Sequence, residues 1–180
     1  KLSKPRVTAE RLREVLHYDP ETGMFTWLPR ALDEFKRPSQ GKTWTSRFPG
    51  TKAGAPCKKG YIGIAIDRVI FKAHRLAFLY MTGAWPEHEV DHINQVKADN
   101  RWGNLRDVRH QVNSQNARVM RKRKTGAGML GAHVEKDSGR IYACIGVNGR
   151  VRWLGYHPTV EAAHAAYVAA KREHHKGCTL

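Results

Sequence analysis

The segment VDHINQVKADNRWGNL, residues 90–105, contains the polar residues on which the predicted fold and chemistry of this chain depend. Asp91 and His92 stand next to each other in it, and Asn104 follows twelve positions after His92. Asn113 comes nine positions later. A carboxylate and an amide oxygen suit a hard divalent cation, and an imidazole can take a proton from water. Hydrolysis of a phosphodiester with one metal ion needs these side chains, so the spacing indicates that chemistry.

The residues around these side chains predict strand, loop, strand and helix in that order. We expect one strand around Asp91, a second over 105–108 and a helix over about 110–118. Successive side chains of a strand point to opposite faces, so His92 is expected on the face opposite to Asp91. The predicted helix carries Asn113 back over the first strand, where its amide and the carboxylate would share a metal ion.

The polar loop between the two strands has two interpretations. Asn104 is predicted to brace the loop so that the histidine and the metal meet one phosphate. The alternative is structural, because Asp and Asn commonly hold turns through hydrogen bonds to the backbone. Asn94, Asp99 and Asn100 belong to the same group of loop residues. The ordered set on this frame favours the functional interpretation.

Composition points to a polyanion as partner. The chain has 180 residues, 32 Lys or Arg against 16 Asp or Glu, and a formal net charge of +16. Nucleic acid is the commonest partner of so basic a protein. A membrane surface is the alternative, but no sustained basic amphipathic helix and no apolar run near the ~20 residues of a membrane span is found. We therefore expect no membrane association and, since the first residues lack the apolar core of a secretion signal, an intracellular location.

The N-terminal third combines a short helix and strand with a long basic stretch. Thr8 can cap a helix, and 24–27 is expected as a strand after a turn. Residues 29–60 contain four prolines with several glycines and many basic residues, which is the composition of a loop. Its basic residues, with Trp44 and Phe48, are candidates for contact with a nucleic-acid backbone, and a solvated loop is the equally weighted alternative.

Several motifs in order resemble an HNH endonuclease, closest to the phage and homing branch with a ββα-metal fold. They are His74-Arg75-Leu76-Ala77, Asp91-His92-Ile93-Asn94, Asp99-Asn100-Arg101, Asn104-Leu105-Arg106 and Asn113-Ser114-Gln115-Asn116. The resemblance covers about residues 60–118. It implies DNA cleavage in the cytoplasm of a bacterial or phage-infected host cell.

The resemblance also implies roles for individual residues. His92 would be the general base and Asn104 the residue that positions the active loop, while Asp91 and Asn113 would bind one divalent metal ion. Because this chain has Asn113 where the family often has histidine, we favour Mg²⁺ or Mn²⁺, with Zn²⁺ or Ni²⁺ as alternatives. Arg75 either holds a phosphate or anchors a helix to the core. Cysteine pairs that bind a second, structural zinc in some relatives are missing, since Cys-x-x-Cys spacing does not occur.

The C-terminal third resembles an AP2-type DNA-binding domain. Strands are expected over 129–134, 140–147 and 151–156, with Asn148-Gly149 as a hairpin turn, and a helix begins after Thr159. The matching pieces are Gly131, Arg140, Ala143-Cys144-Ile145, Arg152-Trp153-Leu154-Gly155-Tyr156, Glu161-Ala162-Ala163 and Ala166-Tyr167. In that family the sheet enters the major groove. The expected DNA contacts are therefore Arg140, Arg150, Arg152 and Trp153, and a plain solvated surface is the alternative.

A basic segment joins the two regions. We expect it to track DNA phosphates through Arg118, Arg121, Lys122, Arg123 and Lys124. The expected organisation is an N-terminal helix, strand and long basic loop (1–59), an HNH nuclease core (60–118), a basic glycine-containing linker (119–128) and an AP2-like DNA-binding domain (129–177). The predicted fold class is α+β: a ββα-metal core joined to a three-stranded sheet with one helix.

These observations predict a divalent-metal-dependent endonuclease of double-stranded DNA, with its site chosen partly by the C-terminal sheet. One centre cleaves one strand at a time, so a monomer would nick and a homodimer would cut both strands. A catalytically inactive DNA-binding regulatory protein is the alternative, against which the intact set of polar residues argues. An RNA-binding protein is a third hypothesis, which would require exposed aromatic rings for stacking on bases, and the sequence shows no aromatic cluster of the RNP type.

Overall fold

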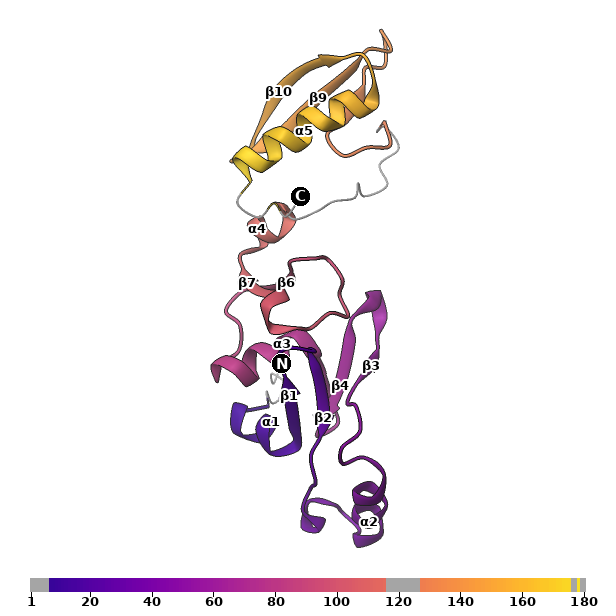
Figure 1. Cartoon of the computed structure of the whole chain (residues 1–180), viewed down its shortest axis with the longest axis vertical. Helices are drawn as coiled ribbons and strands as arrows, with labels where there is room; N and C mark the ends of the chain where they lie inside the picture. The colour runs from indigo at the N-terminus through magenta and orange to yellow at the C-terminus, as the bar shows by residue number, and fades with distance from the viewer. Residues whose placement is uncertain (1–6, 116–126, 176–177, 179–180) are drawn as a thin grey trace, which may run out of the picture. The chain divides into compact units, whose positions relative to one another are not determined.

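The computed structural model describes residues 7–115, 127–175 and 178. Its contacts divide the chain into two units, Lys1–Val108 and Arg109–Leu180. Both units mix helices with small antiparallel sheets, which agrees with the expected α+β class (Figure 1). The division falls inside the segment 60–118 that was expected to form one nuclease core.

The first unit is built from short elements. In chain order they are α1 (Ala9–Val15), β1 (Leu16–Asp19), β2 (Met24–Trp27), η1 (Leu32–Glu34), α2 (Pro38–Arg47), β3 (Ala55–Pro56), η2 (Lys58–Gly60), β4 (Ile62–Ile66), β5 (Val69–Lys72), α3 (Ala73–Thr82), β6 (Glu89–His92), η3 (Trp102–Asn104) and β7 (Leu105–Val108). The strands form three antiparallel groups: β1 with β2, β3 with β4 and β5, and β6 with β7. The strand-loop-strand order expected around the aspartate–histidine pair is present as β6 and β7.

The core of the first unit lies between α1, β4 and α3. Its most deeply buried aliphatic side chains are Leu12, Val15, Leu16, Ile64, Ile66, Leu76 and Leu79. Burying one such side chain contributes about 1.5–3 kcal/mol. Val90 of β6 and Leu105 of β7 join the same core and are almost completely buried. The hairpin that carries the catalytic candidates is therefore anchored through its apolar positions.

Residues 38–47, expected as part of a long loop, form the helix α2. Pro38 occupies the start of the helix, where its missing N–H and fixed φ are tolerated. Trp44 packs against Phe48, Phe35 and, edge to face, Trp27. The prediction of a loop was wrong because these aromatic contacts lie outside the local hydrophobic pattern, which is weak here.

The second unit contains α4 (His110–Gln115), β8 (Ala132–Val134), β9 (Ile141–Val147), β10 (Arg150–His157) and α5 (Val160–His174). The three strands form an antiparallel sheet in the order β10-β9-β8, and α5 runs across one face of it (Figure 1). Ala132, Ala143 and Ala163 are fully buried between sheet and helix. A side chain at Gly131 would lie 2.0 Å from the Tyr167 ring. The helix therefore approaches the sheet closely because small residues line the contact.

Candidate active site

Asp91 is a buried carboxylate, and Arg106 binds it across the hairpin. The residue is 8% exposed, and Arg106 lies directly opposite it in the β6–β7 register. The Nε and Nη2 atoms of Arg106 donate hydrogen bonds to the same carboxylate oxygen, Oδ2, at 3.0 and 2.8 Å. A buried charge needs such a partner. The pair fixes the carboxylate in place.

His92 follows on the same strand and is 4% exposed. Its Nε2 lies 3.3 Å from Oδ1 of Asn100, an acceptor that assigns the ring proton to Nε2 and the lone pair to Nδ1. Burial lowers the pKa of His92, against the opposing effects of the Asn100 hydrogen bond and the Asp91 charge. The imidazole is therefore held neutral and oriented, which is the state that a general base requires.

Asn104 makes its hydrogen bonds to the loop between β6 and β7. Its Oδ1 accepts from the backbone N–H of Asn94 at 3.0 Å, and its Nδ2 donates to Asn94 Oδ1 and to the carbonyl of Asp99. Asn94 also donates to the carboxylate of Asp99. These are the contacts expected of a residue that braces the loop, and they do not place Asn104 in contact with the His92 ring.

The N-terminal hairpin supports the same loop, a connection that the sequence analysis missed. The buried hydroxyl of Tyr18 donates to the carbonyl of Asn100 at 2.7 Å, and the N–H of Trp102 donates to the carbonyl of Pro20. A side chain at Gly23 would lie 2.3 Å from the backbone nitrogen of Arg101. The turn between β1 and β2 is thus pressed against the backbone that positions the His92 partner.

His74 is a second buried histidine beside the first. It is 4% exposed, and its ring meets the ring of His92 edge to face with centroids 5.0 Å apart. Burial, with a contribution from the charges of His92 and Lys72, lowers the pKa of His74 to about 3. Within the described part of the chain, its buried Nδ1 has no hydrogen-bond partner. The motif His74-Arg75-Leu76-Ala77 predicted no role for His74, and the structure packs it as a neutral neighbour of His92.

Arg75 and Asn113 are the remaining candidate residues of the expected nuclease core. The Nη1 of Arg75 donates to the carbonyl of His88 at 3.4 Å, and its guanidinium lies over the ring of Trp85. These contacts suit the anchoring role of Arg75 better than the phosphate role. Asn113 lies in α4, which belongs to the second unit, so its metal-binding partnership with Asp91 stays a prediction.

The sheet of the second unit carries a row of aromatic rings on the face away from α5. Tyr142 stacks on His133 of β8 and on Trp153 of β10, with centroids 5.1 and 4.9 Å apart. Trp153 is 52% exposed and meets Tyr156 edge to face. The guanidinium of Arg140 lies 4.2 Å from the centroid of the Tyr156 ring. The sequence showed no aromatic cluster because the members of this row come from three different strands.

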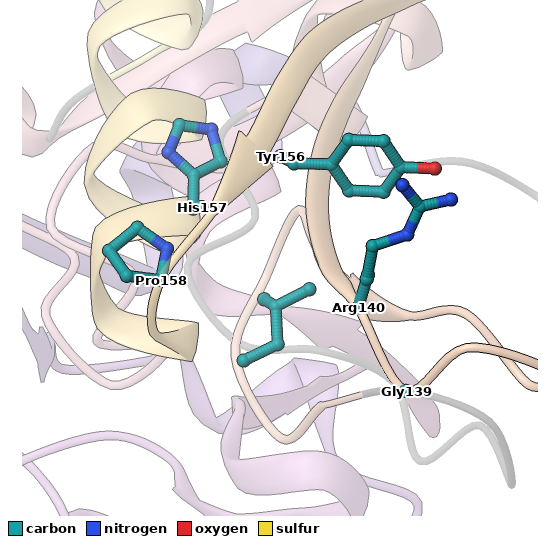
Figure 2. Close-up of a pocket in the computed structure, with 6 residues that line it drawn as sticks. Gly139, Arg140, Tyr156, His157 and Pro158 are labelled. Carbon is teal, nitrogen blue, oxygen red and sulfur yellow. The ribbon is translucent and has the colours of Figure 1, made fainter.

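Figure 2 shows Arg140 alongside the Tyr156 ring at one end of this face, with His157 on the side nearer α5. These residues line an open hollow of about 330 Å³ with Gly139, Ile141 and Pro158.

The other predicted DNA contacts are placed differently. Arg152 pairs in register with Ile145, which is buried, and its Nη1 lies 2.6 Å from Nε2 of His174 on α5. Arg152 therefore belongs to the helix side of the sheet, and exposed Arg150 alternates onto that side at the end of the strand. The basic linker residues Arg118, Arg121, Lys122, Arg123 and Lys124 lie outside the described residues.

Comparison with known proteins finds a similarity in the central segment. Residues 71–115 match the family model HNH_3, described as HNH endonuclease. The matched segment contains Asp91, His92, Asn104 and Asn113 and supports a nuclease of the HNH type. Searches among curated proteins and among solved structures give no match. The AP2-type interpretation of the C-terminal unit therefore rests on the sequence resemblance alone.

Two further findings bear on partners and cofactors. In the described ranges, helices long and apolar enough to cross a membrane do not occur. The same ranges do not bring three or more His, Cys, Asp or Glu side chains together as a closed metal site would. Taken singly, the carboxylate of Asp91 and the amide oxygen of Asn113 are donors of the type that Mg²⁺ or Mn²⁺ prefers.

Proposed function

We propose that this protein is a divalent-metal-dependent DNA endonuclease. The observation that carries the proposal is the buried aspartate–histidine pair of β6, in which Arg106 fixes the carboxylate and Asn100 orients the imidazole. The family match over residues 71–115 supports the same class. In β6, a neutral, oriented histidine stands beside an ion-paired carboxylate, and the loop that follows is braced by Asn104 and by the N-terminal hairpin. A purely structural role would not require this arrangement.

His92 accepts the proton of the attacking water in the proposed reaction. The hydroxide forms a bond to phosphorus, and the bond from phosphorus to the leaving sugar oxygen breaks. Asp91 and Asn113 would hold the metal ion, Mg²⁺ or Mn²⁺ in preference to Zn²⁺ or Ni²⁺. When bound, such an ion stabilises negative charge on the phosphate and on the leaving oxygen. Asn104 keeps the loop in the conformation that presents His92 to the phosphate.

Double-stranded DNA is the proposed substrate. The net charge of +16 favours a polyanion, and the resemblance to AP2-type domains gives the C-terminal sheet a part in site choice. The aromatic row could also suggest RNA, since exposed rings stack on single-stranded bases. However, β9 is the central strand, so His133 and Trp153 cover opposite faces of the Tyr142 ring. A Tyr142 ring that is stacked on both sides has no free face for an unpaired base, which favours double-stranded DNA as the substrate.

The test is cleavage of supercoiled plasmid by the full chain with Mg²⁺, with Mn²⁺ or with EDTA. We expect metal-dependent nicking that EDTA abolishes. His92→Ala should lower the rate about 10²–10⁴-fold, the usual contribution of a general base, and leave DNA affinity nearly unchanged. His17→Ala, which changes an exposed histidine of β1, is the matched control and should cleave at the parental rate. Cleavage by His92→Ala at the parental rate would contradict the assigned mechanism.

The cleavage products also distinguish a monomer from a homodimer, and a nuclease from an inactive DNA-binding protein. Nicked circles as the end product indicate a monomer acting on one strand, whereas prompt linear product indicates a homodimer. Tight DNA binding without cleavage under any metal would instead support a catalytically inactive, regulatory DNA-binding protein.

A further inference from the structure

Two lysine ammonium groups lie against one aromatic ring next to the proposed active site. The Nζ of Lys72 is 4.4 Å from the centroid of the Tyr61 ring, and the Nζ of Lys97 is 5.1 Å from it. Lys72 ends β5, Lys97 lies in the loop between β6 and β7, and Tyr61 precedes β4. Three separate segments of the first unit therefore bring two positive charges to the same aromatic ring.

A backbone carbonyl and an aromatic ring hold the two ammonium groups. Lys97 donates a hydrogen bond of 3.0 Å to the backbone carbonyl of Lys59 in η2, and both ammonium groups lie over the π-system of the Tyr61 ring, which attracts cations. Within the ranges that the structure describes, neither Lys72 nor Lys97 forms an ion pair with Asp or Glu. Both side chains are exposed. An anion from solution can therefore reach both ammonium groups and would be attracted by their charges.

The lysine pair lies beside the histidines of the site. The Tyr61 ring centroid is 5.0 Å from that of His74 and 6.1 Å from that of His92. Burial is the main cause of the lowered pKa of both histidines, and the charges of Lys72 and Lys97 add to the effect on His74 and His92 respectively. The ring that the two lysines contact is therefore a direct neighbour of both buried histidines.

We propose that Lys72 and Lys97, arranged on the Tyr61 ring, bind a phosphate of the DNA backbone and thereby position the cleaved strand over His92. The ligand is a phosphodiester, and the lysines are positioning residues with no part in proton transfer. This proposal rests on the proposed nuclease function only where it says that the bound phosphate belongs to the DNA strand that is cleaved. Phosphate binding itself does not require cleavage. Contact with one phosphate is worth about one unit in the salt dependence of DNA binding.

The experiment compares two charge-matched double variants in the His92→Ala background, where DNA is bound without being cut. Lys72→Met/Lys97→Met removes the proposed site while keeping unbranched stems beside Tyr61. Arg13→Met/Arg68→Met removes the same charge from exposed positions in α1 and in the turn between β4 and β5, outside the basic stretch 29–60. We expect the first variant to weaken binding of a short duplex severalfold and to lower the slope of log K against log salt by about 1, and the second to keep the parental slope. Equal slopes for both double variants would overturn the proposal.

Three further measurements separate positioning from general damage. Lys72→Arg/Lys97→Arg keeps the charge and should restore most of the affinity, whereas no recovery would indicate a packing defect and overturn the phosphate role. With His92 intact, Lys72→Met/Lys97→Met should raise KM for plasmid nicking more than it lowers kcat, and the reverse split would contradict a positioning role. Competition by inorganic phosphate should be far weaker than competition by duplex DNA; equal competition would mean a free anion site. The salt slope tests the site even if the parent does not cleave.

Discussion

Arg106 and Asp91 face each other across the β6–β7 hairpin, and two guanidinium nitrogens of Arg106 bind one carboxylate oxygen of Asp91. Arg106→Met would leave this buried carboxylate without that partner. We expect the free energy of unfolding, measured by urea titration, to fall by about 3 kcal/mol or more. Asp91→Asn in the same chain should recover part of the loss, because it removes the buried charge that Arg106 no longer neutralises.

The matched control for Arg106 is Arg101, which forms an exposed ion pair with Asp99 at 2.6 Å. Arg101→Met should cost no more than about 1 kcal/mol, since exposed pairs contribute little. Equal losses for the two variants would show that burial of the Asp91 pair does not matter.

Gly23 tests the support that the N-terminal hairpin gives to the active loop. Its φ is +70°, and a side chain there would lie 2.3 Å from the nitrogen of Arg101. Gly50 has a φ of +78° with open space around it. Gly50→Ala should therefore cost about 1–2 kcal/mol from backbone strain alone. Gly23→Ala should cost about 1–3 kcal/mol more, because the loop backbone must move.

The Gly23→Ala variant should also slow plasmid nicking at temperatures where it remains folded, since the displaced backbone carries Asn100, the partner of His92. A parental cleavage rate in a destabilised but folded Gly23→Ala protein would show that the hairpin supports stability only.

Burial of His74 predicts a loss of stability in acid. The pKa of His74 falls from its ordinary value of 6.5 to about 3 because of burial. Between these values the unfolded chain takes up a proton that the folded chain refuses, so the free energy of unfolding falls as the pH drops below 6.5. Above pH 6.5 the effect vanishes. His74→Leu should remove about 2–3 kcal/mol of this loss near pH 4.5.

Urea titrations of parent and His74→Leu between pH 7.5 and 4.5 measure the effect, with the exposed His17→Leu as control. Burial also lowers the pKa of His92, so His92 destabilises the folded protein in acid as well. The free energy of unfolding of His74→Leu should therefore fall less steeply with decreasing pH than that of the parent, but it should still fall. Parallel curves for parent and His74→Leu would contradict the prediction.

Arg140 and Arg152 distinguish the two sides of the C-terminal sheet. Arg140 lies on the aromatic face over Tyr156, whereas Arg152 contacts His174 of α5. If the aromatic face meets DNA, Arg140→Ala should weaken duplex binding and lower the salt slope by about 1, and Arg152→Ala should do less. Binding titrations over a range of salt measure both. A larger effect of Arg152→Ala would place the DNA on the other side.

Local chemistry explains what was predictable. The turn Asn148-Gly149 joins β9 to β10 with φ of +52° and +78°, values that Asn and Gly adopt at little cost, so this hairpin was readable from two letters. The caps at Thr8 and Thr159 are likewise local: each hydroxyl accepts from the N–H three residues on. The order of Asp91, His92 and Asn104 on strand and loop was recovered for the same reason.

The partners of these side chains were not predictable, because they come from distant parts of the chain. Asn100 was interpreted as a loop residue, yet it orients His92 and is itself held by Tyr18. Residues 38–47 form a helix because Trp44 finds aromatic neighbours outside it.

The sequence by itself determined the α+β character, the basic charge and the identity of the chemical groups, since each follows from composition or from spacings of a few residues. Only the tertiary structure decided that Arg106 binds Asp91, that His74 packs against His92 and that Lys72 and Lys97 share the Tyr61 ring. The physical reason is that the free energies of burial and of charge pairing depend on which segments meet in space. Segments far apart in the chain supply the two partners, so no single stretch of sequence predicts the contact.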